Sequence, residues 1–125
     1  MVDYIGRITR AQVNDLYGRS RLGLVLYQPA ANHYESQPIK MFEYMAAGLP
    51  VVASDFSLWR RIIEENSIGI CVPPTDVNAV HNAIDQLMNA PEMGQQMGRN
   101  GRKAVMEKYN WSVEEKKLIA LYCQL

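Results

Sequence analysis

Short apolar runs alternate along the chain with longer stretches in which apolar residues recur every three or four positions. The runs predict four strands, at residues 2–5, 22–27, 50–53 and 69–72, and the longer stretches predict about six helices. Residues 22–27 are almost continuously apolar, which is typical of a parallel strand buried on both faces. The alternation across short connections therefore predicts an α/β fold, a Rossmann-like parallel sheet with helices on both faces.

Side chains that accept hydrogen bonds stand where several predicted helices begin. Thr9 precedes a helical pattern that runs to about residue 19, Asp76 precedes one that runs to about residue 89, and Ser112 precedes the last one. Pro91 suits the first turn of a further helix, because its fixed backbone angle is already helical and a donor there has no partner.

The stretch from residue 34 to residue 54 combines a polar loop, a short helix and a buried strand. Ser36 or Gln37 can cap the helix and Pro38 is tolerated in its first turn, so the helix is predicted to begin between residues 36 and 38. Gly48, followed closely by Pro50, is a typical stop signal. The face predicted to pack on the sheet consists of Ile39, Phe42, Met45 and Ala46.

The presence of two acidic residues in this stretch, Glu35 and Glu43, is not explained by packing of the helix on the sheet. They flank the start of the helix, where free backbone N–H groups and the positive end of the helix dipole favour an anion. Lys40 adds a positive charge nearby, and a carboxylate such as that of Glu43 can accept both hydroxyls of a ribose. On spacing alone, solvated surface charges are the simpler interpretation.

Composition limits the class of protein. A length of 125 residues fits one domain, at residues 1–125, and 48% hydrophobic with 21% charged residues is ordinary for a globular chain. The 13 basic and 13 acidic residues balance, so a broad basic surface for nucleic acid or for a membrane is not expected.

The cysteines and the N-terminus bear on location. Cys71 and Cys123 are too few and too far apart in sequence to propose a disulfide framework or a metal site, and no cofactor or metal is predicted. The first residues lack the apolar run of a signal peptide, and no window reaches the ~20 apolar residues of a transmembrane helix. We therefore expect a cytoplasmic protein that meets a membrane, if at all, from its inner face as a peripheral enzyme.

The motif around the two acids resembles the signature of a known family. Glu35, Glu43 and the run Tyr-Met-Ala-Ala-Gly-Leu-Pro-Val-Val-Ala-Ser look like the hallmark of retaining GT-B glycosyltransferases of family 4, also called group 1. Further landmarks follow in the family's order, at residues 4–8, 16–17, 72–76, 97–102 and 109–112. The resemblance implies the C-terminal, donor-binding half of a GT-B fold, truncated, with the N-terminal acceptor domain absent.

The resemblance also implies roles for the site residues. Glu35 would lie beside the donor sugar as the catalytic residue, the amides that follow it would hold the diphosphate, and Glu43 would bind the ribose. The donor-binding candidates are Ser36, Gln37, Pro38, Ile39, Lys40 and Glu43. Weaker candidates are Arg7 and Ile8, in the loop that meets the base in the family, and His33, which could contact donor or acceptor. The donor would be a sugar carried on UDP or GDP, and the pathway would be polysaccharide biosynthesis.

This chain departs from the family pattern in two ways. Many members have Gly-Phe-Gly where this chain has Ser36-Gln37-Pro38, and an acid often stands where Arg61 does. The family also has two earlier strand–helix units, whose loops supply a cation for the leaving diphosphate, and an acceptor half that excludes water. Without them we expect the fragment to be inactive in transfer, although part of a nucleotide sugar could still bind.

Two alternatives and one structural consequence remain. A sugar-nucleotide 2-epimerase shares the two-half architecture, and a non-catalytic nucleotide-binding or assembly module could use the same scaffold. In the truncated sheet, the apolar strand at residues 22–27 would form a free edge, which invites pairing with another chain. We expect the first strand to rearrange over that edge or the chain to form a homo-oligomer through it.

Overall fold

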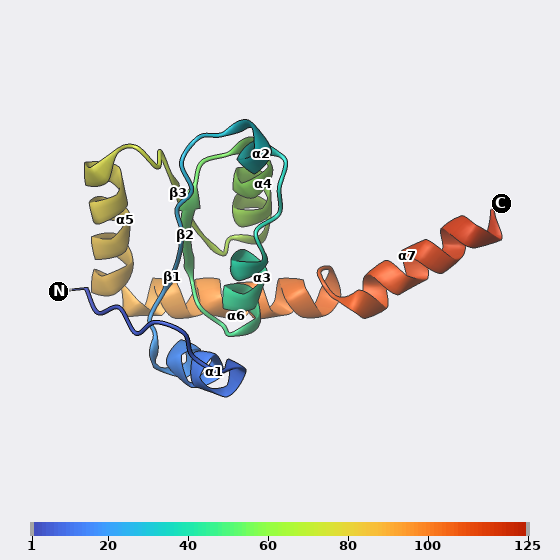
Figure 1. The fold of residues 1–125 in the computed structure, drawn as a ribbon, viewed down its shortest axis with the longest axis horizontal. Coiled ribbons are helices and arrows are strands. Elements are labelled where there is room, and N and C mark those ends of the chain that lie inside the picture. The colour runs from blue at the N-terminus through green and yellow to red at the C-terminus, as the bar shows by residue number, and fades with distance from the viewer. Residues whose placement is uncertain (1, 125) are drawn as a thin grey trace.

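The computed structural model describes residues 2–124 and contains a small parallel sheet between layers of helices (Figure 1). Three strands occur among these residues, β1 (Gly23–Val25), β2 (Val51–Ser54) and β3 (Gly69–Val72), in the spatial order β1-β2-β3. The helices are α1 (Arg10–Arg19), α2 (Ala31–Tyr34), α3 (Ile39–Ala46), α4 (Ser57–Asn66), α5 (Val77–Asn89), α6 (Pro91–Glu107) and α7 (Trp111–Cys123). The predicted α/β class and the parallel sheet are therefore confirmed.

Helices cover both faces of the sheet. In Figure 1 the sheet is seen nearly edge-on, with α5 on one side and α3 and α4 on the other, while α6 runs beneath. The central strand β2 is fully buried and divides the apolar core: Val51 and Ala53 face the α3 and α4 side, and Val52 faces α5. Because side chains alternate between the two faces of a strand, β2 contributes to both halves of the core.

The predicted strand at residues 2–5 is wrong. These residues pair with no strand in the part of the chain that the structure describes, and the side chains of Val2 and Tyr4 are 95% and 94% exposed. A strand is stable only when its backbone groups find partners, and β1 is bonded to β2 alone among the described strands. The sheet consequently has three strands instead of four, with β1 at one edge.

The predicted burial of residues 22–27 on both faces is also wrong. Strand β1 alternates, with Gly23 and Val25 buried and the Leu24 side chain 41% exposed. Helix α5 packs mainly on β2 and β3, and Leu22 and Leu26 pack partly against this half of the core, whereas Leu24 between them stays more exposed. The strand is therefore an edge strand with one face only partly covered.

Helix α3 begins later and faces the core differently than predicted. Pro38 occupies the N-cap position and α3 starts at Ile39, whose side chain is 76% exposed. The buried residues are Met41 and Met45, one turn apart. Of the predicted face, Met45 is buried and Phe42 packs half-buried on the core, whereas Ile39 and Ala46 are exposed. Replacing either methionine by alanine is expected to cost about 2–5 kcal/mol of stability.

The end of α3 was predicted correctly. Gly48 follows the helix with φ of +75°, a conformation that favours glycine, and it lies directly against Gly98 of α6. A Cβ atom at Gly98 would overlap the carbonyl oxygen of Gly48. This close approach fixes α6 beneath α3 and thereby fixes the position of the candidate site on α3.

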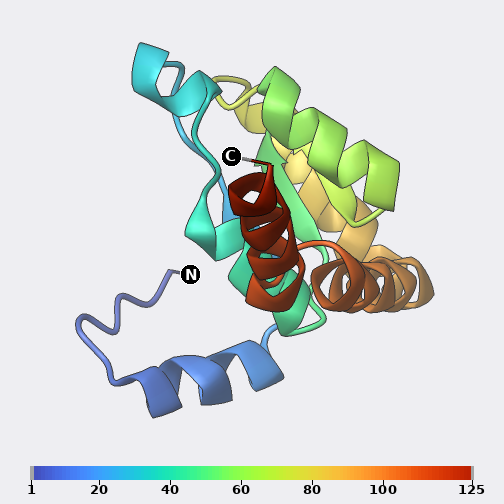
Figure 2. The same ribbon diagram turned by 90° about the vertical axis from the view of Figure 1, so that its right-hand side faces the viewer.

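Helices α1 and α2 lie at opposite ends of the body with α3 between them (Figures 1 and 2). Helix α2 was not predicted; it is a single turn within the polar segment that follows β1. Helix α7 projects away from the body, and the side chains of Trp111 and Tyr122 on it are 67% and 68% exposed. Within residues 2–124, no helix combines the length and the apolar character that crossing a membrane requires.

Candidate functional site

A buried serine holds the start of the loop that carries most candidate residues. Ser54, the last residue of β2, is fully buried, and its Oγ accepts a hydrogen bond from the N–H of Tyr27 at 2.9 Å. The same hydroxyl donates to the carbonyl oxygen of Tyr27 at 2.8 Å. The side chain thus continues the β1–β2 pairing past the end of β1, and residues 28–38 leave the sheet at the carboxyl ends of its strands, where ligands of open α/β sheets bind.

A buried tryptophan holds the other end of the loop. Trp59 of α4 is fully buried and its Nε1 donates to the carbonyl oxygen of Ser36 at 2.6 Å. Its ring also packs edge-on against Tyr27, with the ring centroids 5.4 Å apart. Since Ser36 lies just before α3, this hydrogen bond sets the direction in which the backbone enters the helix.

The predicted side-chain cap of α3 is wrong. The Ser36 hydroxyl donates to the carbonyl oxygen of His33 at 3.0 Å, and no side-chain cap of α3 exists among the described residues. The first helical residues, Ile39 and Lys40, are exposed, and their backbone N–H groups lie in the first turn of α3, where a helix offers them no acceptor. This is the geometry that the predicted anion site needs, and Lys40 adds a positive charge beside it.

Glu35 and Gln37 are exposed on either side of Ser36, while Pro38 is buried. Glu35 ends α2 as its C-cap, with its backbone in the helical region. Its carboxylate thus belongs to the loop at the carboxyl ends of the strands.

Glu43, in contrast, is engaged by α1. Its Oε2 accepts a hydrogen bond from the Tyr17 hydroxyl at 2.7 Å, and its Oε1 accepts one from Arg10 at 2.9 Å. The Tyr17 hydrogen bond, followed by the Arg10 guanidinium, holds the pKa of the Glu43 carboxyl below its usual range. Burial and the bond to Glu43 raise the pKa of Tyr17 to about 12. Glu43 therefore stays ionised and Tyr17 stays a donor at neutral pH.

Glu43 lies in a hollow of about 500 Å³ between α1, α3 and α6. Arg10 and Tyr17 line it from α1, Ile39 and Phe42 from α3, and Tyr109 follows α6 on the far side. Glu35, Ser36 and Gln37 do not line this hollow. The structure thus gathers Ile39 and Glu43 in one cavity and leaves Glu35 on the loop, with the first turns of α3 between the two acids.

The weaker candidates occupy less specific positions. Arg7 is exposed and Ile8 half-buried in the segment before α1. His33 is half-buried; its Nδ1 lies 2.7 Å from the carbonyl oxygen of Gln28, and its ring packs against Tyr27. Among residues 2–124, no group of three metal-ligating side chains is close enough to hold an ion.

Sequence patterns did not identify Arg10 and Tyr17 as neighbours of Glu43. The contacts join residues 33 and 26 positions apart, which no local periodicity reveals. The only available signal was the pair Leu16–Tyr17, which matches a family landmark without a role attached to it.

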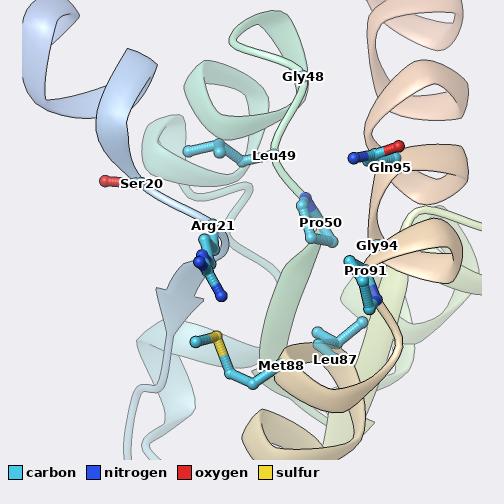
Figure 3. A pocket seen from close by; sticks show the side chains of 10 residues that line it. All are labelled: Ser20, Arg21, Gly48, Leu49, Pro50, Leu87, Met88, Pro91, Gly94 and Gln95. Atoms are coloured by element: carbon cyan, nitrogen blue, oxygen red, sulfur yellow. The ribbon is translucent and has the colours of Figure 1, made fainter.

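A second hollow, of about 410 Å³, lies at the opposite end of the sheet from the loop (Figure 3). It is bounded by Arg21 before β1, by Leu49 and Pro50 before β2, and by Met88 and Pro91 at the junction of α5 and α6. Its lining contains none of the candidate site residues, so it belongs to a different part of the molecule.

Comparison with known proteins gives a consistent result. The family model described as glycosyl transferases group 1 matches residues 1–104. The chain is 31% identical over 121 residues to a phosphatidyl-myo-inositol mannosyltransferase of Mycobacterium leprae, covering 97% of this chain and 29% of that protein. It is 29% identical over 104 residues to an alpha-D-kanosaminyltransferase of Streptomyces kanamyceticus, covering 83% of this chain and 26% of that protein.

A solved structure shares the fold. The sucrose-phosphate synthase of Thermosynechococcus elongatus superposes with a TM-score of 0.83 at 29% identity, over 98% of this chain and 29% of that one. The chain therefore spans less than a third of the length of each of these relatives.

Proposed function

This chain belongs to the glycosyl transferases group 1 family, and from that premise we propose that it is the donor-binding portion of a retaining glycosyltransferase. The donor is a sugar carried on a nucleoside diphosphate of the UDP or GDP type, and the complete enzyme transfers the sugar to an acceptor. The 125 residues bind part of the donor and do not transfer it alone.

The observation that supports this proposal most is the state of Glu43. Its carboxylate is ionised, its side chain is 27% exposed, and it faces a hollow of about 500 Å³, within the usual size range of small-molecule sites. Each carboxylate oxygen has two lone pairs, and Tyr17 and Arg10 use one on each oxygen. One acceptor position per oxygen thus remains for the two hydroxyls of a ribose.

The other roles follow along α3. The N–H groups of Ile39 and Lys40 lie in the first turn of α3, which has no side-chain cap among the described residues, so the helix dipole favours the diphosphate there and the Lys40 ammonium adds to this attraction. Glu35 meets the sugar from the preceding loop, with Ser36, Gln37 and Pro38 beside the phosphates. Glu43 lies in the second turn of α3 and Glu35 in the loop before it, so a diphosphate lying across the start of α3 would have the ribose on the Glu43 side and the sugar on the Glu35 side.

A calorimetric titration of the 125-residue chain with UDP and with GDP tests the proposal. We expect binding of one of them, and we expect Glu43→Gln to weaken it about tenfold or more, the effect of a lost hydrogen bond to a charged group. Glu115→Gln, an equivalent change on the exposed helix α7, should leave the affinity unchanged. Absence of binding at millimolar nucleotide, or equal affinities of wild type and Glu43→Gln, would refute the donor site.

We also propose that two copies of this chain associate through β1. The strand is bonded to β2 alone among the described strands, and Leu24 on its open face is 41% exposed. An edge strand next to an exposed apolar side chain favours pairing with another edge, which would replace the long 3.4 Å hydrogen bond from the Tyr44 hydroxyl to the Leu24 carbonyl oxygen. Light scattering after size exclusion should show a dimer that Leu24→Lys dissociates, whereas a monomeric wild type would refute this arrangement.

The remaining expectations stay predictions. They are a cytoplasmic location, with the complete enzyme peripheral to the inner face of the membrane, and a role in polysaccharide biosynthesis. Arg7, Ile8 and His33 are kept as weaker donor contacts.

A further inference from the structure

Tyr17 is held more firmly than the other donor to Glu43. Its side chain is half-buried between α1 and α3, and its ring packs edge-on against Tyr44, with ring centroids 5.6 Å apart. The hydroxyl reaches Glu43 Oε2 at 2.7 Å, a short, charge-assisted hydrogen bond. The packing of the ring leaves the hydroxyl little freedom to point elsewhere.

Arg10 contacts the same carboxylate in a different way. Its side chain is 64% exposed, and the guanidinium makes one 2.9 Å contact with Oε1. An exposed ion pair of this kind is weak and exchanges readily with water or with another acceptor. The two donors therefore differ: one is fixed by packing, and the other can leave when a ligand arrives.

We propose that Tyr17 is a positioning residue of the donor site, whose hydroxyl fixes the Glu43 carboxylate in the orientation that receives the two ribose hydroxyls. This inference rests on the proposed function, because it assumes that Glu43 binds the ribose. Arg10 is the weaker, exchangeable partner, and one ribose hydroxyl takes the acceptor position on Oε1 that Arg10 leaves free. Tyr17 itself touches no ligand atom in this arrangement.

The geometry explains why a fixed carboxylate matters. A vicinal diol presents two hydroxyls at a fixed spacing, so both can donate only if the plane of the carboxylate is correctly turned. A glutamate carboxylate rotates broadly about its last torsion when nothing holds it. The hydrogen bond to Oε2 removes that freedom before the ligand binds, and preorganisation of this kind favours affinity.

The test compares ribose with deoxyribose nucleotides on the 125-residue chain. UDP, GDP and their 2′-deoxy forms are titrated into wild type, Glu43→Gln, Tyr17→Phe, Arg10→Met and the control Tyr122→Phe, whose ring is exposed on α7. In wild type and Tyr122→Phe, we expect the ribose form to bind about tenfold more tightly, the effect of one hydrogen bond to a charged group. Tyr17→Phe should lose most of this ratio, and Arg10→Met should keep it.

The outcomes separate the two proposals. If Glu43→Gln removes the ratio and Tyr17→Phe keeps it, Glu43 binds the ribose but Tyr17 does not position it, and the present inference alone is refuted. If Tyr17→Phe weakens ribose and deoxyribose nucleotides equally, Tyr17 is only structural, which also refutes it. If wild type binds neither nucleotide, or binds both forms equally, the ribose site itself is refuted, and this inference with it.

Discussion

Ser54→Ala tests whether one buried hydroxyl supports the candidate site. The substitution removes the oxygen that pairs with both the N–H and the carbonyl oxygen of Tyr27, at 2.9 and 2.8 Å. A net hydrogen bond is worth about 1 kcal/mol, and a buried group left unpaired costs about 1–3 kcal/mol. Because Ser54 is fully buried and Tyr27 is half-buried, we expect the free energy of unfolding to fall by about 2–3 kcal/mol.

Urea unfolding followed by tryptophan fluorescence measures this loss, since Trp59 is fully buried and packs on Tyr27. Hydrogen exchange at the Tyr27 amide shows where the stability is lost, because that amide loses its hydrogen-bond acceptor and should exchange faster. Ser57→Ala is the matched control: Ser57 is exposed, and α4 has no side-chain cap among the described residues. A loss below about 0.5 kcal/mol, typical of a surface substitution, together with unchanged exchange at Tyr27, would refute the reasoning.

Two further predictions concern packing and pH. Gly98→Ala places a Cβ atom on the Gly48 carbonyl oxygen and should lower the free energy of unfolding by about 1–3 kcal/mol in a urea titration. The control Gly18→Ala, which has open space around its Cβ on α1, should be neutral or stabilising. Equal effects of the two substitutions would contradict the close contact between Gly98 and Gly48. Glu43 faces Arg10 and Tyr17 from α1, with Tyr109 across the hollow, and its pKa lies below its usual range. Its stabilising effect is therefore present above about pH 4 and is lost as the pH falls through the folded-state pKa. In Tyr17→Phe, carbon-detected NMR titration should show the Glu43 pKa rising toward its usual range, and an unchanged pKa would rule out the hydrogen bond. With the pKa of Tyr17 raised to about 12, the contribution of Tyr17 should be lost on the alkaline side as the pH rises above about 10.

Local sequence rules predicted the elements whose signals are local. Thr9 caps α1 as expected, together with Gln12 in a capping box, and Asp76 caps α5. Gly48 ends α3 where the glycine and the following proline indicated. The last helix begins earlier than predicted because Asn110, rather than Ser112, accepts the hydrogen bond at its start. An asparagine two positions upstream satisfies the same rule, so the sequence alone did not separate the two.

Predictions that required a partner elsewhere in the chain were less successful. Residues 2–5 have the composition of a strand, but a strand also needs a neighbour, and none of the described strands provides one. The exposure of Leu24 has the same origin, since α5 packs mainly on β2 and β3 and this face of β1 is covered only in part. Periodicity along one segment contains no information about which face a distant helix will cover.

The candidate site combines both kinds of information. Local chemistry places the free amides at the start of α3, between Glu35 and Glu43, and this part was predicted from spacing and from the family resemblance. The environment of Glu43 depends on α1, and every residue of α1 remains exposed or half-buried. A helix without a buried face gains little from the hydrophobic effect, so the Tyr17 hydrogen bond to Glu43 and the packing of Tyr17 on Tyr44 contribute a large share of what holds it in place. A ligand that competes for Glu43 would then also act on α1, and the Tyr17 bond decides whether the helix stays docked when Arg10 is displaced.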